Sequence, residues 1–201
     1  MMEKIIFATQ NEHKLMEIRM IMEGLPYEII SMKEAGIDID IIEDGETFAE
    51  NALIKAQAIS KLSHHIVMAD DSGLEIDYLN KEPGVYSARY LGVDTPYPVK
   101  NQIIIDRLEG VNDEERSARF VCEIATIFPN GDVLQARGTI EGRIDYEIKG
   151  VNGFGYDPIF YVPEFECTTA EMPADMKNLH SHRGKALREM AKKLAEVLGH
   201  A

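Results

Sequence analysis

The sequence predicts an α/β domain built on a mixed β-sheet, and three features of the chain lead to this prediction. Residues 4–8 form an apolar strand pattern that runs through a polar turn into an amphipathic helix. Residues 66–69 form a second short apolar run that ends in carboxylates. Residues 118–128 and 133–142 have strand patterns joined by a tight turn containing Asn-Gly, which makes this pair antiparallel and the sheet mixed.

Composition limits the class of protein. The 201 residues are 45% hydrophobic and 28% charged, with no linker rich in Gly, Ser or Pro, so we expect residues 1–201 to form one domain. A net charge of −14 argues against a surface that binds nucleic acid through its phosphates. No signal peptide and no apolar run of membrane-spanning length is visible, and Cys122 and Cys167 fit no zinc or redox spacing. These observations predict a cytoplasmic protein that binds no membrane.

The first strand is followed by a polar turn, residues 9–14, and by a helix. The apolar face of that helix consists of Leu15, Ile18, Met22 and Leu25. Backbone N–H groups at a helix start favour an anion, and Lys14 adds a positive charge. These features favour an anion-binding site. The alternative is an ordinary helix capped by Asn11, with Lys14 in solvent. The turn lacks the glycines of a phosphate-binding loop, and this favours the alternative.

A second strand is expected at residues 27–32 and a second helix from Thr47 to about Leu62. The helix begins with a capping-box pattern, Thr47-Phe48-Ala49-Glu50, and its inner face consists of Phe48, Ala52, Ala56 and Ile59. Asn51 and Lys55 lie four residues apart on another face. Glu43 precedes the helix in an acidic segment. On local sequence alone, Glu43 is an exposed carboxylate, and Asn51 and Lys55 are a solvated helix face.

The most distinctive stretch is residues 66–74, in which the apolar run ends in Asp70, Asp71, Ser72 and Gly73. Ligands of open α/β sheets gather beyond the carboxyl ends of strands. Two neighbouring carboxylates repel each other unless a cation lies between them or one takes a proton, so the pair favours a hard divalent metal such as Mg²⁺. The alternative is a solvated turn. A half-buried strand is expected next, at residues 74–79.

The C-terminal half contains two further segments of interest. Glycines flank Phe154 in the segment 150–158, which suits close approach to a flat ligand or, alternatively, a turn that buries the ring. A helix is expected at residues 98–108, and Ser181 is the expected cap of a last helix. The inner face of that last helix consists of Leu187, Met190, Leu194 and Leu198. Its start is rich in groups that bind anions or read a base, namely His180, His182, Arg183 and Lys185, although His-x-His alone is too small for a metal site.

Six blocks of the chain occur in a characteristic order. They are Thr9 to Lys14, Glu43 with Thr47-Phe48 and Asn51-Ala52, Ala69 to Leu74, Pro83 to Tyr90, Gly153 to Pro158, and Ser181 to Gly184. Together they resemble the inosine triphosphate pyrophosphatase family, which includes the Ham1-like and RdgB-like proteins. Two positions differ from the family pattern: Asn152 replaces a usual glycine and Cys167 a common lysine. Neither touches the carboxylates, so these differences concern the shape of the pocket.

The resemblance implies a fold, an activity and an assembly. The fold is an elongated mixed β-sheet flanked by helices, with two lobes around a central cleft. The activity is hydrolysis of dITP, ITP and XTP to the monophosphate and pyrophosphate, which requires Mg²⁺, with Mn²⁺ as a substitute, and which cleanses the nucleotide pool. The assembly is a homodimer.

The resemblance also assigns residues. Asp71 is the proton acceptor and a metal ligand, and Glu43 is a second carboxylate of the metal site, to which the acidic pair adds Asp70. The substrate contacts are Thr9, Gln10, Asn11, Glu12, His13, Lys14, Asn51, Lys55, Ser72, Phe154, Gly155, Tyr156, Asp157, Lys177, His182 and Arg183. In this hypothesis residues 9–14 hold the triphosphate, residues 154–157 and Lys177 hold the nucleoside, and His182 and Arg183 face the oxo edge of the purine.

Two other functions agree with the same residues. A phosphohydrolase that uses Asp70 or Asp71 as a covalent nucleophile would form an aspartyl-phosphate and release orthophosphate. A nucleotide-binding module without catalysis would bind ITP without turnover.

Overall fold

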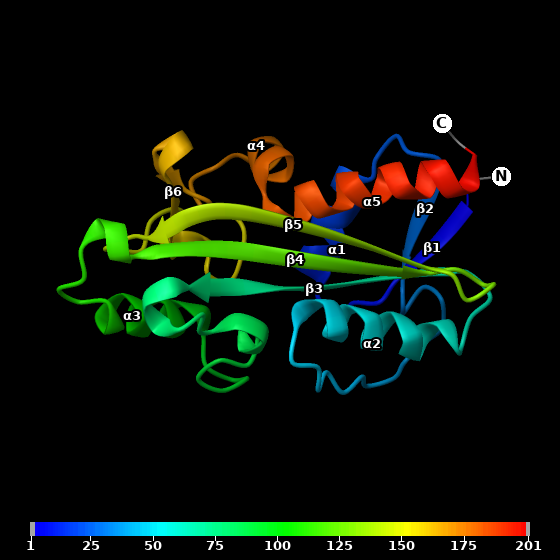
Figure 1. Ribbon diagram of the computed structural model, residues 1–201, viewed down its shortest axis with the longest axis horizontal. Coiled ribbons are helices and arrows are strands. Elements are labelled where there is room, and N and C mark those ends of the chain that lie inside the picture. Colours follow the sequence, from blue (N-terminus) through cyan, green and yellow to red (C-terminus); the bar gives the residue numbers. More distant parts are fainter. Residues whose placement is uncertain (1–2, 200–201) are drawn as a thin grey trace. The chain divides into compact units, whose positions relative to one another are not determined.

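The computed structural model describes residues 3–199 and confirms the α/β class with a mixed sheet (Figure 1). Met1, Met2, His200 and Ala201, which the one-domain prediction includes, lie outside the described residues. The strands are β1 (Glu3–Phe7), β2 (Tyr27–Ser31), β3 (Ile66–Ile76), β4 (Ser117–Ile127), β5 (Val133–Ile144), β6 (Phe160–Val162) and β7 (Cys167–Thr168). The helices are α1 (Glu12–Ile21), α2 (Phe48–Ser60), α3 (Tyr97–Arg107), α4 (Ala174–His180) and α5 (His182–Leu198). Within residues 3–199, none of these helices combines the length and the apolar character that crossing a membrane requires.

The seven strands form one sheet in the order β2-β1-β3-β4-β5-β6-β7. Strand β1 pairs in parallel with both β2 and β3, whereas β6 pairs antiparallel with both β5 and β7. Short 3₁₀ turns lie in the connections, for example at Asp77–Leu79 and Asp157–Ile159. The predicted turn between β4 and β5 forms, with the N–H of Phe128 donating to the carbonyl of Asp132 over 2.9 Å.

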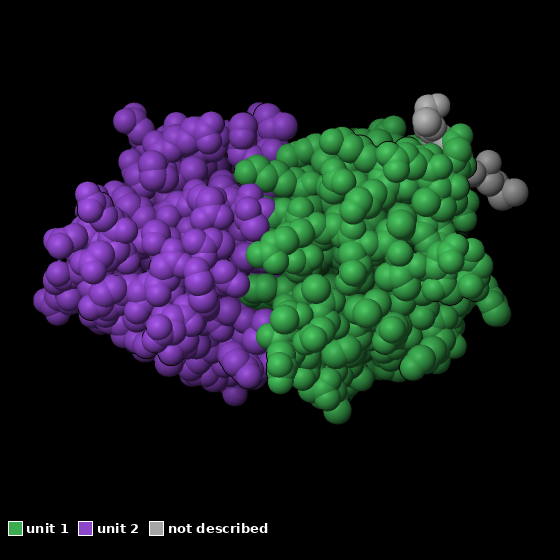
Figure 2. All heavy atoms as spheres, viewed as in Figure 1, with its two compact units in different colours: residues 1–71, 122–138, 182–201 green, residues 72–121, 139–181 purple. Residues whose placement is uncertain are grey.

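The chain divides into two compact units, which Figure 2 shows in different colours. The first comprises residues 1–71, 122–138 and 182–201, and the second comprises residues 72–121 and 139–181. Each unit has a hydrophobic core of its own.

The first unit has helices on both faces of its part of the sheet. Helices α1 and α5 contact each other and pack on one face, over Ile66 and Met68 of β3. Helix α2 packs on the opposite face, over Val67 and Ala69. This alternation follows from the two-residue period of a strand. Figure 1 shows α2 on one side of β3 and α5 on the other.

The predicted helix caps form in this unit. Asn11 caps α1, and its side chain accepts the N–H of Lys14 over 3.1 Å. Thr47 and Glu50 make the capping box of α2, in which Thr47 Oγ1 accepts the N–H of Glu50 over 3.2 Å and Glu50 returns the contact. The predicted inner faces of both helices, and that of α5, lie in the core.

The acidic stretch after residue 69 is part of a strand, so the expected end of the strand at residue 69 and the alternative of a solvated turn are both wrong. Strand β3 runs without interruption from Ile66 to Ile76. The expected separate strand at residues 74–79 is therefore the end of β3 followed by the 3₁₀ turn Asp77–Leu79. Asp, Ser and Gly favour turns in isolation, but cationic side chains on both faces of the sheet stabilise these two carboxylates within a buried strand.

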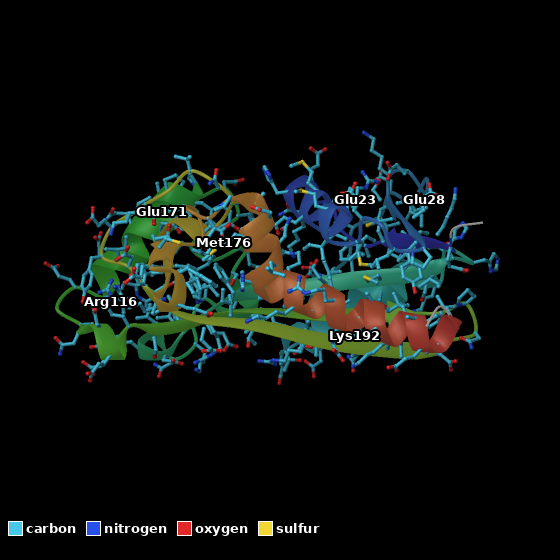
Figure 3. The ribbon with its side chains drawn as sticks, turned by 90° about the horizontal axis from the view of Figure 1, so that it is seen from above. Glu23, Glu28, Arg116, Glu171, Met176 and Lys192 are labelled. Carbon is cyan, nitrogen blue, oxygen red and sulfur yellow. The ribbon has the colours of Figure 1, made fainter. Side chains whose placement is uncertain are left out.

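The second unit packs α3 against β3, β4 and β5. Its core includes Leu74 of β3, Ile104 of α3, Phe120 of β4 and Ile140 of β5. Arg116, which is labelled in Figure 3, is 1% exposed and donates to the backbone carbonyls of residues 108, 144 and 145, each over 2.8 Å. These bonds use three of its five N–H groups and tie the connection after α3 to the end of β5.

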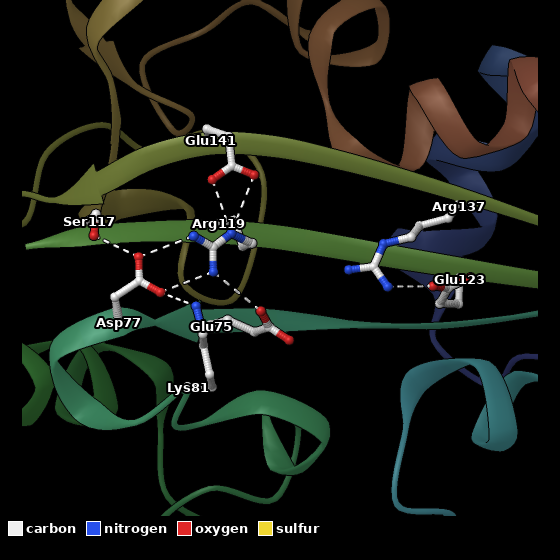
Figure 4. A network of polar contacts seen from close by, with 8 residues as sticks. All are labelled: Glu75, Asp77, Lys81, Ser117, Arg119, Glu123, Arg137 and Glu141. Carbon is white, nitrogen blue, oxygen red and sulfur yellow. Dashed lines mark hydrogen bonds and ion pairs between the residues drawn. The ribbon is translucent and has the colours of Figure 1, made fainter.

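A second polar network of this unit lies on the surface of the strands. Figure 4 shows Asp77 accepting from Arg119 and Ser117, with Arg119 Nη1 at 3.0 Å and Ser117 Oγ at 2.6 Å. Arg119 also contacts Glu141 of β5 over 3.0 Å, and Lys81 pairs with Asp77. The network therefore links the ends of three neighbouring strands.

Candidate active site

Asp70 and Asp71 point to opposite faces of the sheet because they are successive residues of β3. Asp70 continues the alternate residues that face α1 and α5, and Asp71 continues those that face α2. Both residues are buried, with 1% and 7% of their surfaces exposed. The sequence thus brings one carboxylate to each face of the first unit.

Asp70 is surrounded by cations. Lys14 Nζ lies 3.1 Å from its Oδ2 and 3.3 Å from its Oδ1, and Arg183 Nη2 lies 3.4 Å from Oδ2. Burial raises the pKa of Asp70, but Lys14, Arg183 and Lys55 lower it more, so the net pKa is well below its ordinary value. Asp70 is therefore ionised at neutral pH, and both of its oxygens contact cationic groups.

Glu17 contacts Arg183 from the other side. Arg183 is 2% exposed, and its Nη1 donates to Glu17 Oε2 over 2.5 Å. Its pKa is raised, since Asp70 and Glu17 outweigh the effect of burial, which lowers it. Glu17 was not predicted from the sequence. Its spacing of three from Lys14 places both on one side of α1 and was the available signal.

Asp71, on the opposite face, shares an ammonium group with Glu43. Lys55 Nζ of α2 lies 3.0 Å from Glu43 Oε2 and 3.5 Å from Asp71 Oδ1. The pKa of Asp71 is raised, by burial first and also by Glu43 and Asp70, against the opposing effect of Lys55 and Lys14. Glu43 and Asp71 are 28 positions apart in the sequence, and Lys55 contacts both of them.

Asn51 and Gly45 hold the segment that carries Glu43. The buried Asn51 accepts the backbone N–H of Gly45 at its Oδ1 over 2.9 Å. A Cβ on Gly45 would lie 2.8 Å from both Asn51 Oδ1 and Glu50 Cβ, so a larger residue cannot approach the helix this closely. Asn51 Nδ2 is buried and has no hydrogen-bond acceptor within residues 3–199, which leaves its two N–H groups for a ligand.

The polar turn before α1 provides further donors. Thr9 Oγ1 accepts the N–H of Asn11 over 3.1 Å, while Gln10 and His13 are exposed. The backbone N–H groups of the first helical turn and the Lys14 ammonium give this end of α1 a positive potential.

The predictions that place Lys14, Asn51 and Lys55 in solvent are wrong, because all three lie at least partly buried in the polar cluster of the first unit.

In the second unit a smaller cluster surrounds Asp157. This buried carboxylate accepts from Lys177 Nζ over 2.7 Å, from Thr169 Oγ1 over 2.8 Å and from the N–H of Phe154 over 2.8 Å. Lys177 Nζ also lies 5.1 Å from the centre of the Phe154 ring. A Cβ on Gly153 would lie 2.2 Å from Asp157 Oδ2, so the turn requires glycine there. The half-buried Phe154 ring does not belong to the core, which excludes the core-plug alternative.

The loop after Phe154 is fixed by two long-range bonds. Asn101 Nδ2 of α3 donates to the carbonyl of Gly155 over 3.1 Å. The Tyr156 hydroxyl donates to the carbonyl of Ser87 over 2.7 Å, and Ser87 Oγ accepts the N–H of Leu74 over 2.9 Å. The loop is thus a rigid element of the second unit. Ser72 and Tyr156, both predicted as substrate contacts, also lie in this unit.

The start of α5 is also fixed closely. Helix α4, which the sequence did not predict, ends at His180, and Ser181 separates it from α5. His182 and Arg183 lie buried in the first turn of α5. A Cβ on Gly138 of β5 would lie 2.2 Å from the carbonyl oxygen of His182, so glycine permits this approach. These two residues are therefore not solvated charges, although polar side chains at a helix start ordinarily are.

The carboxylates suit a divalent cation that takes most of its ligands from elsewhere. Within residues 3–199 no group of three or more His, Cys, Asp or Glu is arranged around one point. Glu43 and Asp71 are two carboxylates that already contact one cationic group, the Lys55 ammonium. Mg²⁺ is bound in this way in many enzymes, through one or two carboxylates with waters and substrate phosphates completing its shell. The donor set therefore fits Mg²⁺.

Comparison with known proteins places the chain among close relatives. The model of the Ham1 family matches residues 5–193. A protein of Clostridium perfringens described as a dITP/XTP pyrophosphatase is 46% identical over 203 aligned residues, which cover 98% of this chain and 100% of that protein. A Bacillus subtilis protein with the same description is 42% identical over 193 residues, covering 96% of this chain and 98% of that protein.

Solved structures agree with the sequence matches. The Ham1 protein of Staphylococcus aureus superposes with a TM-score of 0.87 at 37% identity, covering 97% of this chain and 100% of that chain. A HAM1 protein of Coxiella burnetii superposes with a TM-score of 0.88 at 43% identity, with the same coverage. The predicted resemblance is confirmed.

Proposed function

The chain belongs to the Ham1 family, and from this premise we propose that it hydrolyses dITP, XTP and ITP to the monophosphate and pyrophosphate. It is a dITP/XTP pyrophosphatase, a hydrolase of nucleotide metabolism. The structural observation that carries the reaction is the contact of Glu43 and Asp71 with one ammonium group. Two carboxylates that contact one cation can also hold a divalent metal ion, and hydrolysis of a triphosphate uses such an ion.

Glu43 and Asp71 are the residues that would hold Mg²⁺, or Mn²⁺ in its place. When bound, the metal would supply positive charge that offsets the charge of the leaving pyrophosphate. Asp70 was also predicted as a ligand. We assign it instead to holding Lys14 and Arg183, because both of its oxygens contact these cations on the opposite face of β3.

Asp71 is the proton acceptor in this proposal. A buried carboxylate with a raised pKa is a stronger base than an exposed one, which suits the removal of a proton from water. The water would attack the α-phosphorus in line with the departing pyrophosphate, so the protein contributes mainly positioning and charge. The start of α1 with Lys14 binds the triphosphate, and Asn51 Nδ2 offers one more donor group.

The Phe154 loop of the second unit binds the nucleoside. The half-exposed ring offers a stacking surface, and Lys177 and Asp157 are held beside it by the contacts described above. In this proposal His182 and Arg183 face the 6-oxo group of the purine. A site built around donors to that oxygen rejects adenine by roughly 10⁴-fold, because the 6-amino group leaves the donors unpaired.

The assembly and the location are also proposals. The family resemblance supports a homodimer, which the mass of the protein in solution checks. Cys122 and Cys167 are both free thiols, which supports a reducing compartment, the cytoplasm.

A product assay tests the proposed function. Purified protein with Mg²⁺ is expected to convert dITP to dIMP and pyrophosphate, with ATP a poor substrate. Asp71→Asn is expected to lower kcat by about 10³-fold or more while dITP still binds, because the proton acceptor and a metal ligand are lost. Chromatography of the nucleotide products and separate assays of pyrophosphate and orthophosphate provide the measurement. Exposed Asp94→Asn is the control.

The two alternatives give different results in the same assay. Release of orthophosphate together with a trappable aspartyl-phosphate would favour a covalent phosphohydrolase. Tight binding of ITP without any product would favour a binding module. Either result contradicts the proposed reaction.

A further inference from the structure

Lys55 is a buried cation at the centre of the acidic cluster on the α2 face. It is 8% exposed, although a lysine in the middle of a helix is ordinarily solvated. Its ammonium donates to Glu43 Oε2 over 3.0 Å and lies 3.5 Å from Asp71 Oδ1. A lysine ammonium is charged at neutral pH, since its ordinary pKa is about 10.4.

We propose that Lys55 is a resident counter-cation of the metal site, which competes with a free divalent ion for Glu43 and Asp71. The inference rests on the proposed function, because it takes these two carboxylates as the metal ligands. In the free protein the ammonium holds the carboxylates together. When metal and nucleotide bind together, the ammonium leaves them and contacts phosphate oxygens.

The distances support this competition. Lys55 Nζ contacts one oxygen of each carboxylate, Glu43 Oε2 at 3.0 Å and Asp71 Oδ1 at 3.5 Å, so the ammonium bridges these two oxygens as a metal ion would. Mg²⁺ needs its oxygen ligands at about 2.1 Å, which draws the two oxygens closer together than the ammonium does. An ion that bridges these same two oxygens therefore displaces the ammonium from between them.

Charge gives the direction of the effect. Glu43 and Asp71 carry two negative charges and Lys55 one positive charge, so a free divalent ion meets less negative charge than the two carboxylates alone would offer, together with the repulsion of a nearby ammonium. A triphosphate brings several negative charges, which compensate the ion and the ammonium together. Lysine suits this exchange because its charge is compact and its four-carbon stem is flexible.

Two consequences follow for the free and the loaded protein. Free metal binds weakly without nucleotide, so the metal enters together with the substrate. Without metal and nucleotide, Lys55 holds Glu43 and Asp71 together. With both bound, it stabilises negative charge on the triphosphate. Lys14 cannot take this place, because its ammonium lies against Asp70 on the other face of the sheet.

The test measures metal binding in the absence of nucleotide. Mn²⁺ is titrated into the full chain and the free ion is counted by electron paramagnetic resonance. Lys55→Met is expected to bind Mn²⁺ at least about tenfold more tightly than the natural protein, because the competing charge is removed. Lys55→Gln, which keeps a donor without the charge, is the second variant and gives the same direction.

Thermal unfolding provides an independent readout. Without metal, Lys55→Met is expected to have a lower Tm than the natural protein, because Glu43 and Asp71 repel each other. Saturating Mn²⁺ is expected to raise the Tm of the variant more than that of the natural protein, since tighter binding gives greater stabilisation. Lys61→Met, at the exposed C-cap of the same helix, is the control and should behave as the natural protein does.

The outcomes separate this inference from the proposed function. Equal or weaker Mn²⁺ binding by both Lys55 variants, or no binding by any of the proteins, overturns the inference even if dITP is hydrolysed normally. Tighter binding by the variants supports it even if the natural protein releases no pyrophosphate, in which case the proposed reaction fails alone.

Discussion

At the scale of single residues, Asp70 and Asp71 are both buried in β3, but their pKa values shift in opposite directions. Both of Asp70's oxygens contact cations, and its pKa is held well below its ordinary value. Asp71 has a raised pKa, which burial causes first, and it shares Lys55 with Glu43. The charged form of Asp70 therefore stabilises the folded protein. The charged form of Asp71 destabilises it, because burial disfavours that charge more than nearby cations favour it.

This difference predicts opposite effects of the same substitution. Asp70→Asn is expected to lower the free energy of unfolding by about 3 kcal/mol, because it breaks a buried ion pair and leaves Lys14 and Arg183 with less compensation. Asp71→Asn is expected to leave stability unchanged or to increase it at pH 7, because it removes a carboxylate whose charged form burial disfavours. Urea unfolding of both variants provides the measurement, and a larger loss for Asp71→Asn would contradict the assignment.

The residues that the sequence could not assign share a physical reason. Lys55 and Asn51 are polar and lie four apart on a helix, a pattern that ordinarily indicates a solvated face. They are buried because acidic partners from β3 and from the segment before α2 surround them, and such partners are distant in the sequence. Family resemblance supplied these residues, and local pattern alone argued against them.

At the scale of elements, periodicity predicted well wherever one face of an element meets the core. The inner faces of α1, α2 and α5 and the capping box at Thr47 are confirmed. The sequence predicted two strands where the structure has the single strand β3, because Asp70 to Gly73 have the composition of a turn. Local propensity takes no account of the cations that contact these carboxylates in the folded protein. Helix α4 was missed because seven residues, Ala174–His180, are too few to display a period.

The position of α5 on β5 depends on Gly138. Gly138→Ala is expected to lower the free energy of unfolding by about 2 kcal/mol, because its Cβ would meet backbone atoms of α5 that cannot turn aside. It is also expected to reduce dITP turnover, since the first turn of α5 carries Arg183. Urea unfolding and the pyrophosphate assay provide the two measurements.

Gly24→Ala is a matched variant that separates the effect of a steric clash from the effect of backbone strain. Gly24 has a φ of +81°, and no atom lies within 4 Å of the position that a Cβ would take there, so Gly24→Ala strains the backbone without a clash. We expect it to cost some stability and to keep full turnover. Equal turnover in Gly24→Ala and Gly138→Ala would show that the approach of α5 to β5 does not matter for the site.

At the scale of the whole molecule, the sequence predicted the class and the mixed sheet correctly, whereas the segments that make up each compact unit come from the structure alone. Both units are assembled from segments that are distant in sequence, such as residues 1–71 and 182–201. No linker marks their boundaries, because β3, β4 and β5 each contribute to both units. Composition and linker signals detect boundaries between successive domains, and they contain no information about units that share strands.

Acid stability is the property of the whole molecule that the surface network around Asp77 predicts. Burial raises the pKa of Asp77, but hydrogen bonds from Arg119, Lys81 and Ser117 together lower it more, so the net pKa is well below its ordinary value. A group whose pKa is depressed on folding stabilises the protein above its unfolded pKa of about 3.9 and loses that contribution as the pH falls toward the folded value. Asp77 therefore stabilises the native state at neutral pH and does so less in acid.

The comparison of Asp77→Asn with the natural protein at several pH values tests this. The Tm of the variant is expected to lie below that of the natural protein at pH 7, and the gap is expected to narrow as the pH falls below about 4, where the unfolded carboxyl is protonated. Asp94→Asn, in an exposed loop, controls for the change in net charge and should show a gap near zero throughout. A gap for Asp77→Asn that stays constant from pH 7 to about pH 3 would mean that the ion pairs drawn in Figure 4 contribute nothing through charge.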